Sequence, residues 1–313
     1  MKQTCAKLVE EFKRKRLAIK GEKIRFSGVG DRDVYNITAP FFDNGEWVIA
    51  GRVERRDTEH STVKFFVERD GVWAPRSGTP TFILQDPFVT RIDGELIFGG
   101  VETYPHPTIP KALGWRTNFY RGNDVSSLRQ FATGPDGMKD IRLVKMVNGK
   151  IGIFTRPQGK VGGRGKIGFI AVDSLSELTP RIIDRAQLID QFADAEWGGA
   201  NEVHVLKNGL LGVLGHIACF GDTGERHYYP MVFCYDPRRH FATPMELIAT
   251  RAEFPGGPAK RSDLVDVVFS GGLRRLPNGQ AEFYAGVSDA EAHKIVVEDP
   301  FVKFEENMED END

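Results

Sequence analysis

The chain has 313 residues, of which 27% are charged and 40% hydrophobic, and its formal net charge is −2. That balance excludes the strong basic field that draws a protein to nucleic acid or to an anionic membrane surface, so we expect neither partner. No stretch approaches the roughly 18 consecutive apolar residues of a membrane-spanning helix.

The N-terminal residues 1–25 are predicted to be a short helical extension, because residues 1–18 can form a basic amphipathic helix. The stretch MKQTCAKLVEEFKRKRLAIK lacks the apolar core of a signal peptide. The three cysteines, Cys5, Cys219 and Cys234, form no CxxC motif and leave an odd thiol. Such cysteine usage favours a reducing compartment, so we expect a cytoplasmic protein.

One hairpin phrase occurs five times between residues 26 and 303. The copies are NGEWVIAGRVE from Asn44, DGELIFGGVET from Asp93, NGKIGIFTRPQ from Asn148, NGLLGVLGHIA from Asn208 and NGQAEFYAGVS from Asn278. Asn-Gly or Asp-Gly between apolar runs predicts a hairpin, because a type I′ turn needs positive φ at both central residues. Repeats of roughly 50 to 70 residues built from short strands are typical of propeller blades. We therefore expect an all-β fold, a five-bladed β-propeller over residues 26–303, since a two-layer sandwich would not explain the repeated phrase.

The segments between and after the repeats carry weaker signals. Residues 173–190 are expected to hold a helical turn between blades, and the acidic residues 304–313 are predicted to be a disordered tail. GRGKIG, residues 163–168, matches GxGxxG but precedes an apolar strand instead of opening a helix, so it predicts a loop. Arg164 and Lys166 of that loop are further candidates for ligand contact. No HExxH motif and no Cys/His cluster with zinc spacing is present, and we expect neither a metal nor a cofactor.

Polar side chains recur where the hairpin strands end. Residues about eight positions before and after a turn meet at the same end of an antiparallel hairpin, and a propeller gathers these ends in one central funnel. The positions after the turns hold Arg52, Arg156 and His216, those before them hold Asn36, Asp86, Asp140 and Asn201, and Glu202 and Asp289 lie close by. Polar residues at strand ends can also be merely exposed, and Asp140 could form a structural ion pair with Lys139. The set as a whole favours a shared site.

The repeats and their flanks resemble a known family. QDPFVTRIDGELIFGG and MKDIRLVKMVNGKIGIFTRPQG are similar to two blades of the five-bladed inverting β-mannoside phosphorylases. GWRTNFYRG, KDIRL, FTRPQG and WGGANEVH resemble more closely the β-1,2-mannosyltransferase/phosphorylase family of trypanosomatid parasites and some bacteria. The resemblance covers about residues 30 to 295, and the order of the motifs is kept.

The resemblance implies an inverting, mannose-specific glycosyltransferase or glycoside phosphorylase. Its partners would be β-1,2-mannan oligosaccharides together with phosphate, mannose 1-phosphate or GDP-mannose. Asp86 matches the lone catalytic aspartate, which acts as general acid, and Arg52, Arg156 and His216 fall where phosphate is held. Arginine suits that role because its planar fork meets phosphate bidentately. The residues expected to contact sugar are Asn36, Asp140, Asn201, Glu202, Asp289, Trp115 and Tyr120.

Three departures from the family pattern keep alternatives open. Gln85 and Phe88 replace the Glu and Arg of the EDPR motif, and His216 is slightly offset from its motif. One alternative is an inverting hydrolase, which needs a second carboxylate roughly 6.5–9.5 Å from the first, with Glu202 as the candidate partner of Asp86. Another is a non-catalytic carbohydrate-binding propeller.

Overall fold

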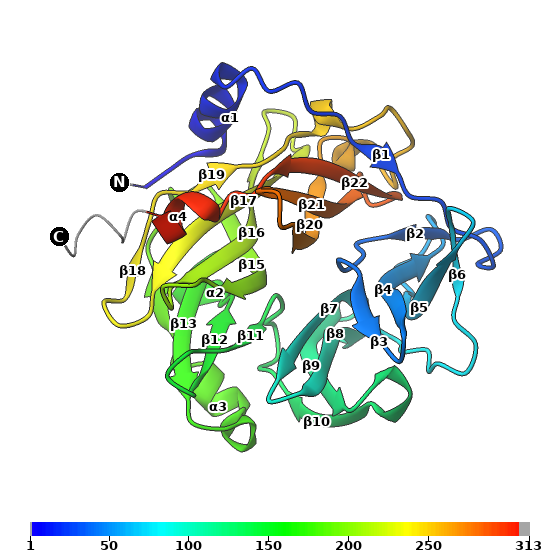
Figure 1. Cartoon of the computed structure of the whole chain (residues 1–313), viewed down its shortest axis with the longest axis horizontal. Coiled ribbons are helices and arrows are strands. Elements are labelled where there is room, and N and C mark those ends of the chain that lie inside the picture. Colours follow the sequence, from blue (N-terminus) through cyan, green and yellow to red (C-terminus); the bar gives the residue numbers. More distant parts are fainter. Residues whose placement is uncertain (1, 307–313) are drawn as a thin grey trace.

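Five antiparallel sheets form a ring around a central axis in the computed structural model, which describes residues 2–306 (Figure 1). The five-bladed β-propeller predicted from the repeats is confirmed. Each sheet is one blade, and in blades two to five the first strand of the sheet lies nearest the axis. Among the helices of residues 2–306, none has the length and hydropathy that a membrane span requires.

The blades follow one another in chain order. Blade one holds β2 (Asp33–Tyr35), β3 (Phe41–Asp43), β4 (Glu46–Glu54), β5 (Thr62–Arg69) and β6 (Val72–Pro75). Blade two holds β7 (Gln85–Ile92), β8 (Glu95–Pro105), β9 (Leu113–Gly122) and β10 (Arg129–Thr133). Blade three holds β11 (Arg142–Lys145), β12 (Ile151–Thr155), β13 (Ile167–Val172) and β14 (Gln187–Ile189). Blade four holds β15 (Trp197–Val205), β16 (Leu211–Phe220), β17 (Arg226–Asp236), β18 (Phe241–Ala242) and β19 (Glu246–Leu247). Blade five holds β20 (Val268–Arg275), β21 (Gln280–Val287), β22 (Glu291–Glu298) and β1 (Glu22–Lys23).

All five predicted hairpins are present, but their turns are of two kinds. At Asn44-Gly45 and Asp93-Gly94 both residues have positive φ, as a type I′ turn requires. In the turns at Asn148, Asn208 and Asn278 only the glycine has positive φ, and Gly149 N donates to the carbonyl of Met146. The type I′ prediction is wrong for these three hairpins, because one more residue precedes the Asn-Gly pair and the longer loop ends on a left-handed glycine.

The N-terminal segment closes the ring. Strand β1 pairs with β22, the third strand of blade five, with Glu22 opposite Lys294 and Lys23 opposite His293. The first strand in the sequence is therefore the outermost strand of the last blade (Figure 1). The predicted extension 1–25 thus contains a propeller strand as well as a helix.

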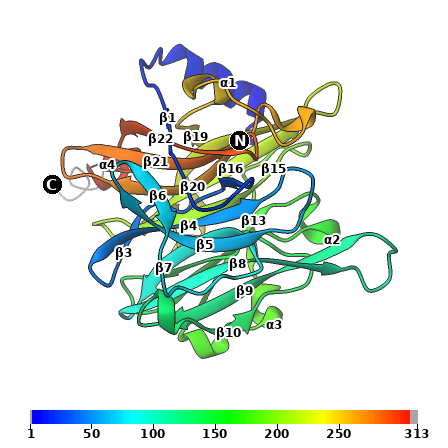
Figure 2. The ribbon, with the colours of Figure 1, turned by 90° about the vertical axis from the view of Figure 1, so that its right-hand side faces the viewer.

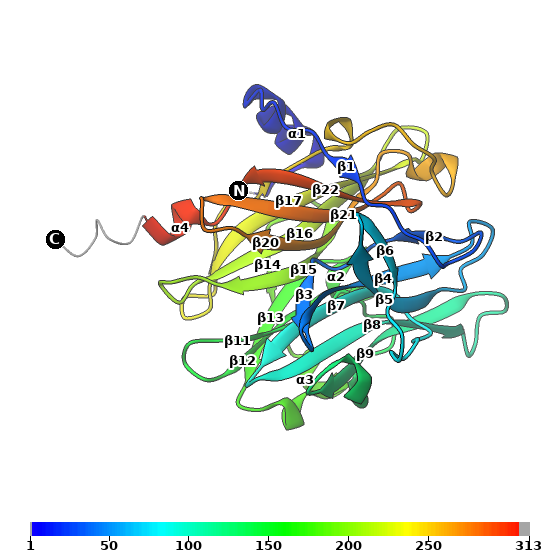
Figure 3. The ribbon, with the colours of Figure 1, turned by 45° about the vertical axis from the view of Figure 1, so that its right-hand side comes forward.

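Helix α1 (Cys5–Arg14) lies outside the ring of sheets, as the side views show (Figures 2 and 3). The Thr4 side chain caps its first turn by accepting from Lys7 N, and Cys5, Leu8 and Phe12 form its buried face. The remaining helices are short: α2 (Gly159–Gly162), α3 (Pro180–Ile183), α4 (Val302–Glu306), and the 3₁₀ turns η1 (Val125–Ser127), η2 (Leu175–Glu177), η3 (Arg251–Glu253) and η4 (Ser262–Leu264). The helical turn predicted within residues 173–190 is present as η2 and α3. The predicted tail 304–313 begins inside α4, and its residues 307–313 lie outside the described residues.

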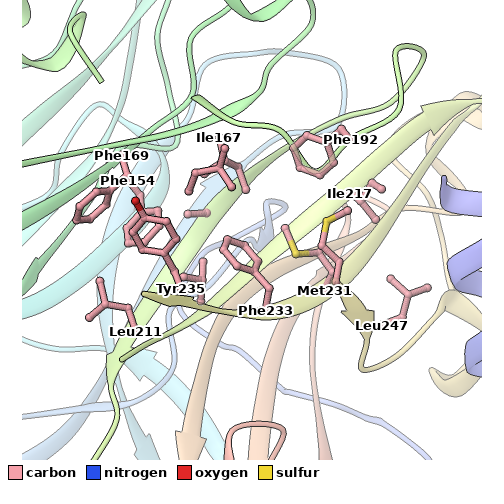
Figure 4. Close-up of a cluster of buried hydrophobic side chains, with 14 of the residues drawn as sticks. Phe154, Ile167, Phe169, Phe192, Leu211, Ile217, Met231, Phe233, Tyr235 and Leu247 are labelled. Carbon is pink, nitrogen blue, oxygen red and sulfur yellow. The ribbon is translucent and has the colours of Figure 1, made fainter. Parts of the chain in front are cut away.

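Apolar side chains fill the wedges between neighbouring blades. In the wedge between blades three and four, the rings of Phe154 and Phe169 lie 5.6 and 4.8 Å from that of Tyr235 (Figure 4). The buried face of α1 packs against the same cluster. Burial of a large apolar side chain contributes about 1.5–3 kcal/mol. These wedges therefore hold the blades in the fixed relation that brings their inner strands to one axis.

Candidate active site

The inner strands share an irregularity that aims polar side chains at the axis. Asn36, Asp86 and Asp140, at equivalent places in blades one to three, all have left-handed backbones with φ of 44°, 48° and 57°. Register shifts occur at the same place in β7, β15 and β20. A bulge redirects the side chain beside it, and Asn and Asp tolerate the left-handed conformation best among non-glycine residues. The polar residues before each turn are thus explained by backbone geometry as well as by chemistry.

Asn36 and Asp86 lie at the bottom of a funnel with two connected hollows. The inner chamber, about 190 Å³, is lined by Asn36, Arg52, Asp86, Asp289 and residues of the loops above them. The outer chamber, about 570 Å³, is lined by Trp115, Arg156, Arg164, Trp197 and Phe220, among others. The two chambers share Glu59, Gln85, Lys139, Arg226 and Tyr228. The predicted funnel is therefore present, with Asp86 in its deeper part.

Asp86 is an ionised carboxylate held from two sides. Nη1 of Arg52 lies 3.1 Å from its Oδ1, and Nδ2 of Asn36 donates to the same oxygen at 2.7 Å. Burial favours the neutral acid, but the charges of Arg52 and Lys139 and the hydrogen bond from Asn36 hold the pKa of Asp86 below its ordinary value. In the ligand-free protein this carboxylate can accept a proton more readily than donate one.

Arg52 is fully engaged in holding carboxylates. Besides Asp86, its Nη2 lies 2.6 Å from Glu54, and its Nε donates to Ser61. Glu54 in turn pairs with Lys260, which reaches in from the loop before blade five. This network explains the charge at the end of β4. The phosphate contact predicted for Arg52 stays a prediction, and no edge of its guanidinium group is free for it in this arrangement.

Arg156 and Asp140 form a second buried ion pair. Nη1 of Arg156 lies 2.9 Å from Asp140 Oδ2, while its Nε donates to the carbonyl of Gly198 and its Nη2 to that of Arg164. Burial alone would raise the pKa of Asp140, yet the positive charge of Arg156 lowers it to about 2. A Cβ on Gly199 would come within 2.9 Å of the Arg156 side chain, so glycine is required there. The structural ion pair considered for Asp140 exists, with Arg156 in place of Lys139.

His216 is neutral and lies below the floor of the funnel. Its Nδ1 is 2.7 Å from Oδ1 of Asn201, and its Nε2 lies 4.0 Å from Asp140. Because an amide oxygen only accepts, Nδ1 carries the hydrogen and Nε2 is left as an acceptor. Burial, together with the nearby charges of Arg156 and Lys139, lowers the pKa of His216 to about 3. His216, Asp140 and Asn201 are thus brought together as predicted, but in a buried layer that does not line the funnel.

Two predicted sugar contacts lie elsewhere. Glu202 follows the bulge of β15 toward its turn, so it lines a separate hollow, where its Oε2 accepts from Leu273 N and lies 2.9 Å from His204 Nε2. Tyr120 is near the far end of β9, packed against Phe82 and Phe98. The structure does not bring either residue to Asp86. The Asp86–Glu202 pair considered for hydrolysis is therefore not formed.

The other predicted residues do reach the funnel. Trp115 lines the outer chamber, and Asp289 is half-buried in the inner one. Burial and the neighbouring charge of Asp86 raise the pKa of Asp289, although Arg52 acts in the opposite direction. Of the two loop candidates, Arg164 lines the outer chamber, whereas Lys166 donates to the carbonyls of Ala193 and Glu196.

The sequence reasoning missed a cation between the chambers. Lys139 lines both and is half-buried, and no carboxylate of residues 2–306 lies within ion-pair distance of it. Arg164 likewise has no carboxylate partner in the described part of the chain, and stacks over Phe220 at 4.4 Å. Arg226 and Tyr228 start β17, the third strand of blade four, and were missed because they lie outside the repeated hairpin phrases on which the prediction rested. No group of three or more His, Cys, Asp or Glu side chains between residues 2 and 306 is placed to hold a metal ion.

Comparison with known proteins identifies a family and solved structures of the same fold. The model of the family described as protein of unknown function (DUF1861) matches residues 10–303, and no curated protein matches the chain. MPT-4, a mannose phosphorylase from Leishmania mexicana solved with a phosphate ion, is 32% identical over 95% of this chain and 93% of that chain, with a TM-score of 0.87. MPT-1, a GDP-Man-dependent mannosyltransferase from the same organism, is 32% identical over 96% and 95%, with a TM-score of 0.86. The β-1,2-mannobiose phosphorylase of Listeria innocua, 14% identical over 93% and 100% with a TM-score of 0.67, shares the fold.

Proposed function

The chain belongs to the DUF1861 family and to that of the Leishmania mannose phosphorylases and mannosyltransferases, and we propose that it transfers mannose with inversion to or from β-1,2-mannan oligosaccharides. The second substrate is either phosphate, which takes up the mannose to give mannose 1-phosphate, or GDP-mannose, which donates it. One observation carries the proposal. Asp86, a buried carboxylate of the inner chamber, lies beneath an outer chamber whose cations Lys139 and Arg164 have no carboxylate partner among residues 2–306.

Proton transfer falls to Asp86. In phosphorolysis, a phosphate oxygen attacks the anomeric carbon while Asp86, as the neutral acid, gives its proton to the departing glycosidic oxygen. In the reverse direction, the Asp86 carboxylate takes the proton of the acceptor hydroxyl, which attacks the anomeric carbon as phosphate leaves mannose 1-phosphate or GDP leaves GDP-mannose. The lowered pKa of Asp86 favours this second direction in the ligand-free protein. Entry of a phosphate dianion beside Asp86 raises its pKa and prepares it for phosphorolysis.

Anion binding falls to Lys139 and Arg164, because neither has a carboxylate partner among residues 2–306. Arg52 and Arg156 are each bound to a carboxylate at 3.1 and 2.9 Å, so they fix Asp86 and Asp140 in place. Lys139 lies at the junction of the chambers, beside Asp86, and Arg164 lines the outer chamber. A phosphate carries about two negative charges, which these two cations can balance. Arg52 and Arg156 then act as positioning residues.

The test is to incubate the purified protein with β-1,2-mannobiose, with and without phosphate, and to assay mannose 1-phosphate and free mannose. We expect mannose 1-phosphate that depends on phosphate, or, in a parallel reaction with GDP-mannose and mannobiose, a lengthened oligosaccharide and GDP. Free mannose formed without phosphate would overturn transfer in favour of hydrolysis. Binding of mannobiose without turnover in any of these reactions would overturn it in favour of a carbohydrate-binding propeller.

A further inference from the structure

A second groove lies toward the turn ends of the inner strands, away from the funnel. It consists of two hollows of about 270 and 400 Å³ that share Pro40 and Arg274. We call it the rear groove. All five blades contribute to the first hollow, and the second follows the seam between blades one and five, beside the ring-closing strand β1. None of its residues lines the funnel.

An exposed aromatic pair stands beside the middle of the rear groove. Trp47 is 48% exposed and Phe42 is 54% exposed, and their ring centroids are 5.6 Å apart in an edge-to-face arrangement. The Arg274 guanidinium group lies 5.3 Å from the centre of the Trp47 ring. A tryptophan held at the surface by a stacked arginine offers a rigid apolar plane next to hydrogen-bonding groups.

The charged side chains of the second hollow are nearly balanced in sign. Arg274 Nε lies 2.8 Å from Glu282, whose carboxylate also accepts from the hydroxyl of Tyr284. The second hollow carries the acidic residues Glu22, Glu68 and Glu282 and the basic residues Lys23, Arg25, Arg274 and Lys294. A polyanion would need a clear excess of positive charge there. In the first hollow, the buried Asn201 has an Nδ2 with no hydrogen-bond partner among residues 2–306.

We propose that the rear groove is a non-catalytic binding site for a neutral saccharide chain. The apolar face of a pyranose ring packs on Trp47, and adjacent hydroxyls bond to the Arg274–Glu282 pair. The proposal rests on the proposed function only for the identity of the sugar, a β-1,2-linked mannose chain. Such a site would keep a long oligosaccharide on the protein between transfers at the funnel.

The test is a calorimetric titration of the full chain with β-1,2-mannotetraose in the absence of phosphate and nucleotide sugar. We expect two binding events per wild-type chain. In Trp47→Ala one of them should be weakened at least tenfold, while turnover of mannobiose is unchanged. Trp47→Phe should restore the second event. Phe241→Ala, which removes a 58% exposed aromatic side chain on β18, should keep both.

A single wild-type binding event that Trp47→Ala leaves unchanged, or two events of wild-type affinity in Trp47→Ala, would overturn the proposal. A change of sedimentation in Trp47→Ala with both events intact would also overturn it and assign the aromatic pair to contact with another copy of the chain. The two proposals fail separately. Loss of the rear groove leaves turnover with one binding event, whereas failure of the proposed function leaves binding without turnover.

Discussion

Arg52 and Asp86 form a buried ion pair across the first two blades, with 3.1 Å between Nη1 and Oδ1. The side chains are only 6% exposed on each side, so solvent screens the pair weakly. Arg52 keeps a second carboxylate, Glu54, at 2.6 Å. The pair therefore keeps Asp86 ionised. Arg52 would still have Glu54 as a carboxylate partner if the Asp86 carboxylate were removed.

Asp86→Asn should abolish turnover but not folding. An amide can neither give nor take the transferred proton, and loss of such a group costs about 100- to 10,000-fold in rate. Because Arg52 retains Glu54, we expect a loss in the free energy of unfolding of only about 1–3 kcal/mol. Initial rates and urea unfolding measure the two effects. Asp33→Asn, which breaks the exposed pair with Arg56, is the control, and undiminished turnover in Asp86→Asn would contradict the assignment.

Lys139→Gln should weaken use of the anionic partner. A hydrogen bond to a charged group contributes about 1.5–3 kcal/mol, so KM for phosphate or GDP-mannose should rise roughly 10- to 100-fold, and kcat should change less. Lys139→Arg should retain much of the affinity. The matched control is Lys145→Gln on the same blade, where the lysine pairs with Asp93 outside the funnel. Unchanged KM values for both partners in Lys139→Gln would remove Lys139 from the anion site.

The fold was predictable because its signal is local and repeated. An Asn-Gly or Asp-Gly turn needs only neighbouring residues to form, and five copies at blade-like spacing leave few architectures. Closure of the ring by β1 was not predictable, since Glu22 and Lys23 form too short a strand to show a pattern, and their partners lie about 270 residues away. The turn type at Asn148, Asn208 and Asn278 depended on loop length, which the dipeptide alone does not fix.

The site was predictable where it follows from antiparallel register. That register brings Asn36, Asp86 and Arg52 together across two blades. Register alone does not distinguish side chains that point into the funnel from those one residue further along the strand. Glu202 was therefore considered as a carboxylate partner of Asp86, but it lines a separate hollow. Register also places Arg156 opposite Asp140 in one hairpin, but it does not show which side chains form an ion pair. The sequence therefore assigned Arg156 to phosphate and offered Lys139 only as an alternative partner of Asp140, whereas Arg156 is the residue that pairs with Asp140.

Arg156→Ala should lower the free energy of unfolding strongly, and its effect on the binding of any one substrate should be smaller. It leaves Asp140, only 1% exposed, without its nearest cation, and removal of one partner of a buried pair costs about 3–5 kcal/mol. In the double variant Asp140→Asn/Arg156→Ala the loss should be smaller than the sum of the two single losses by about 1–3 kcal/mol. Urea unfolding of the four proteins measures this coupling. Additive losses would show that the two side chains have no coupling energy.

His216 should make the protein less stable as the pH falls below neutrality. The pKa of His216 in the folded protein is about 3, below its ordinary value of 6.5. Between these two pH values the unfolded chain binds a proton that the native state does not bind. Stability from this group is complete above pH 6.5 and is lost toward pH 3, by up to about 1.4 kcal/mol per pH unit. The charges that act on it are those of Asp140, Arg156, Lys139 and Arg142. Asp140, with a folded pKa of about 2 against 3.8, loses its contribution only below the latter value.

Between pH 6.5 and about 4, the contribution of His216 to stability therefore changes with pH while that of Asp140 does not. The free energy of unfolding of wild type and His216→Gln, measured by urea titration at several pH values in this interval, should differ in slope by nearly one proton. Glutamine keeps a group that can donate to Asn201 Oδ1 but does not titrate. His60→Gln, at an exposed position, is the control substitution. Equal slopes for wild type and His216→Gln would mean that the native state takes up the proton, and the layer below the funnel would then carry a charged imidazole next to Asp140.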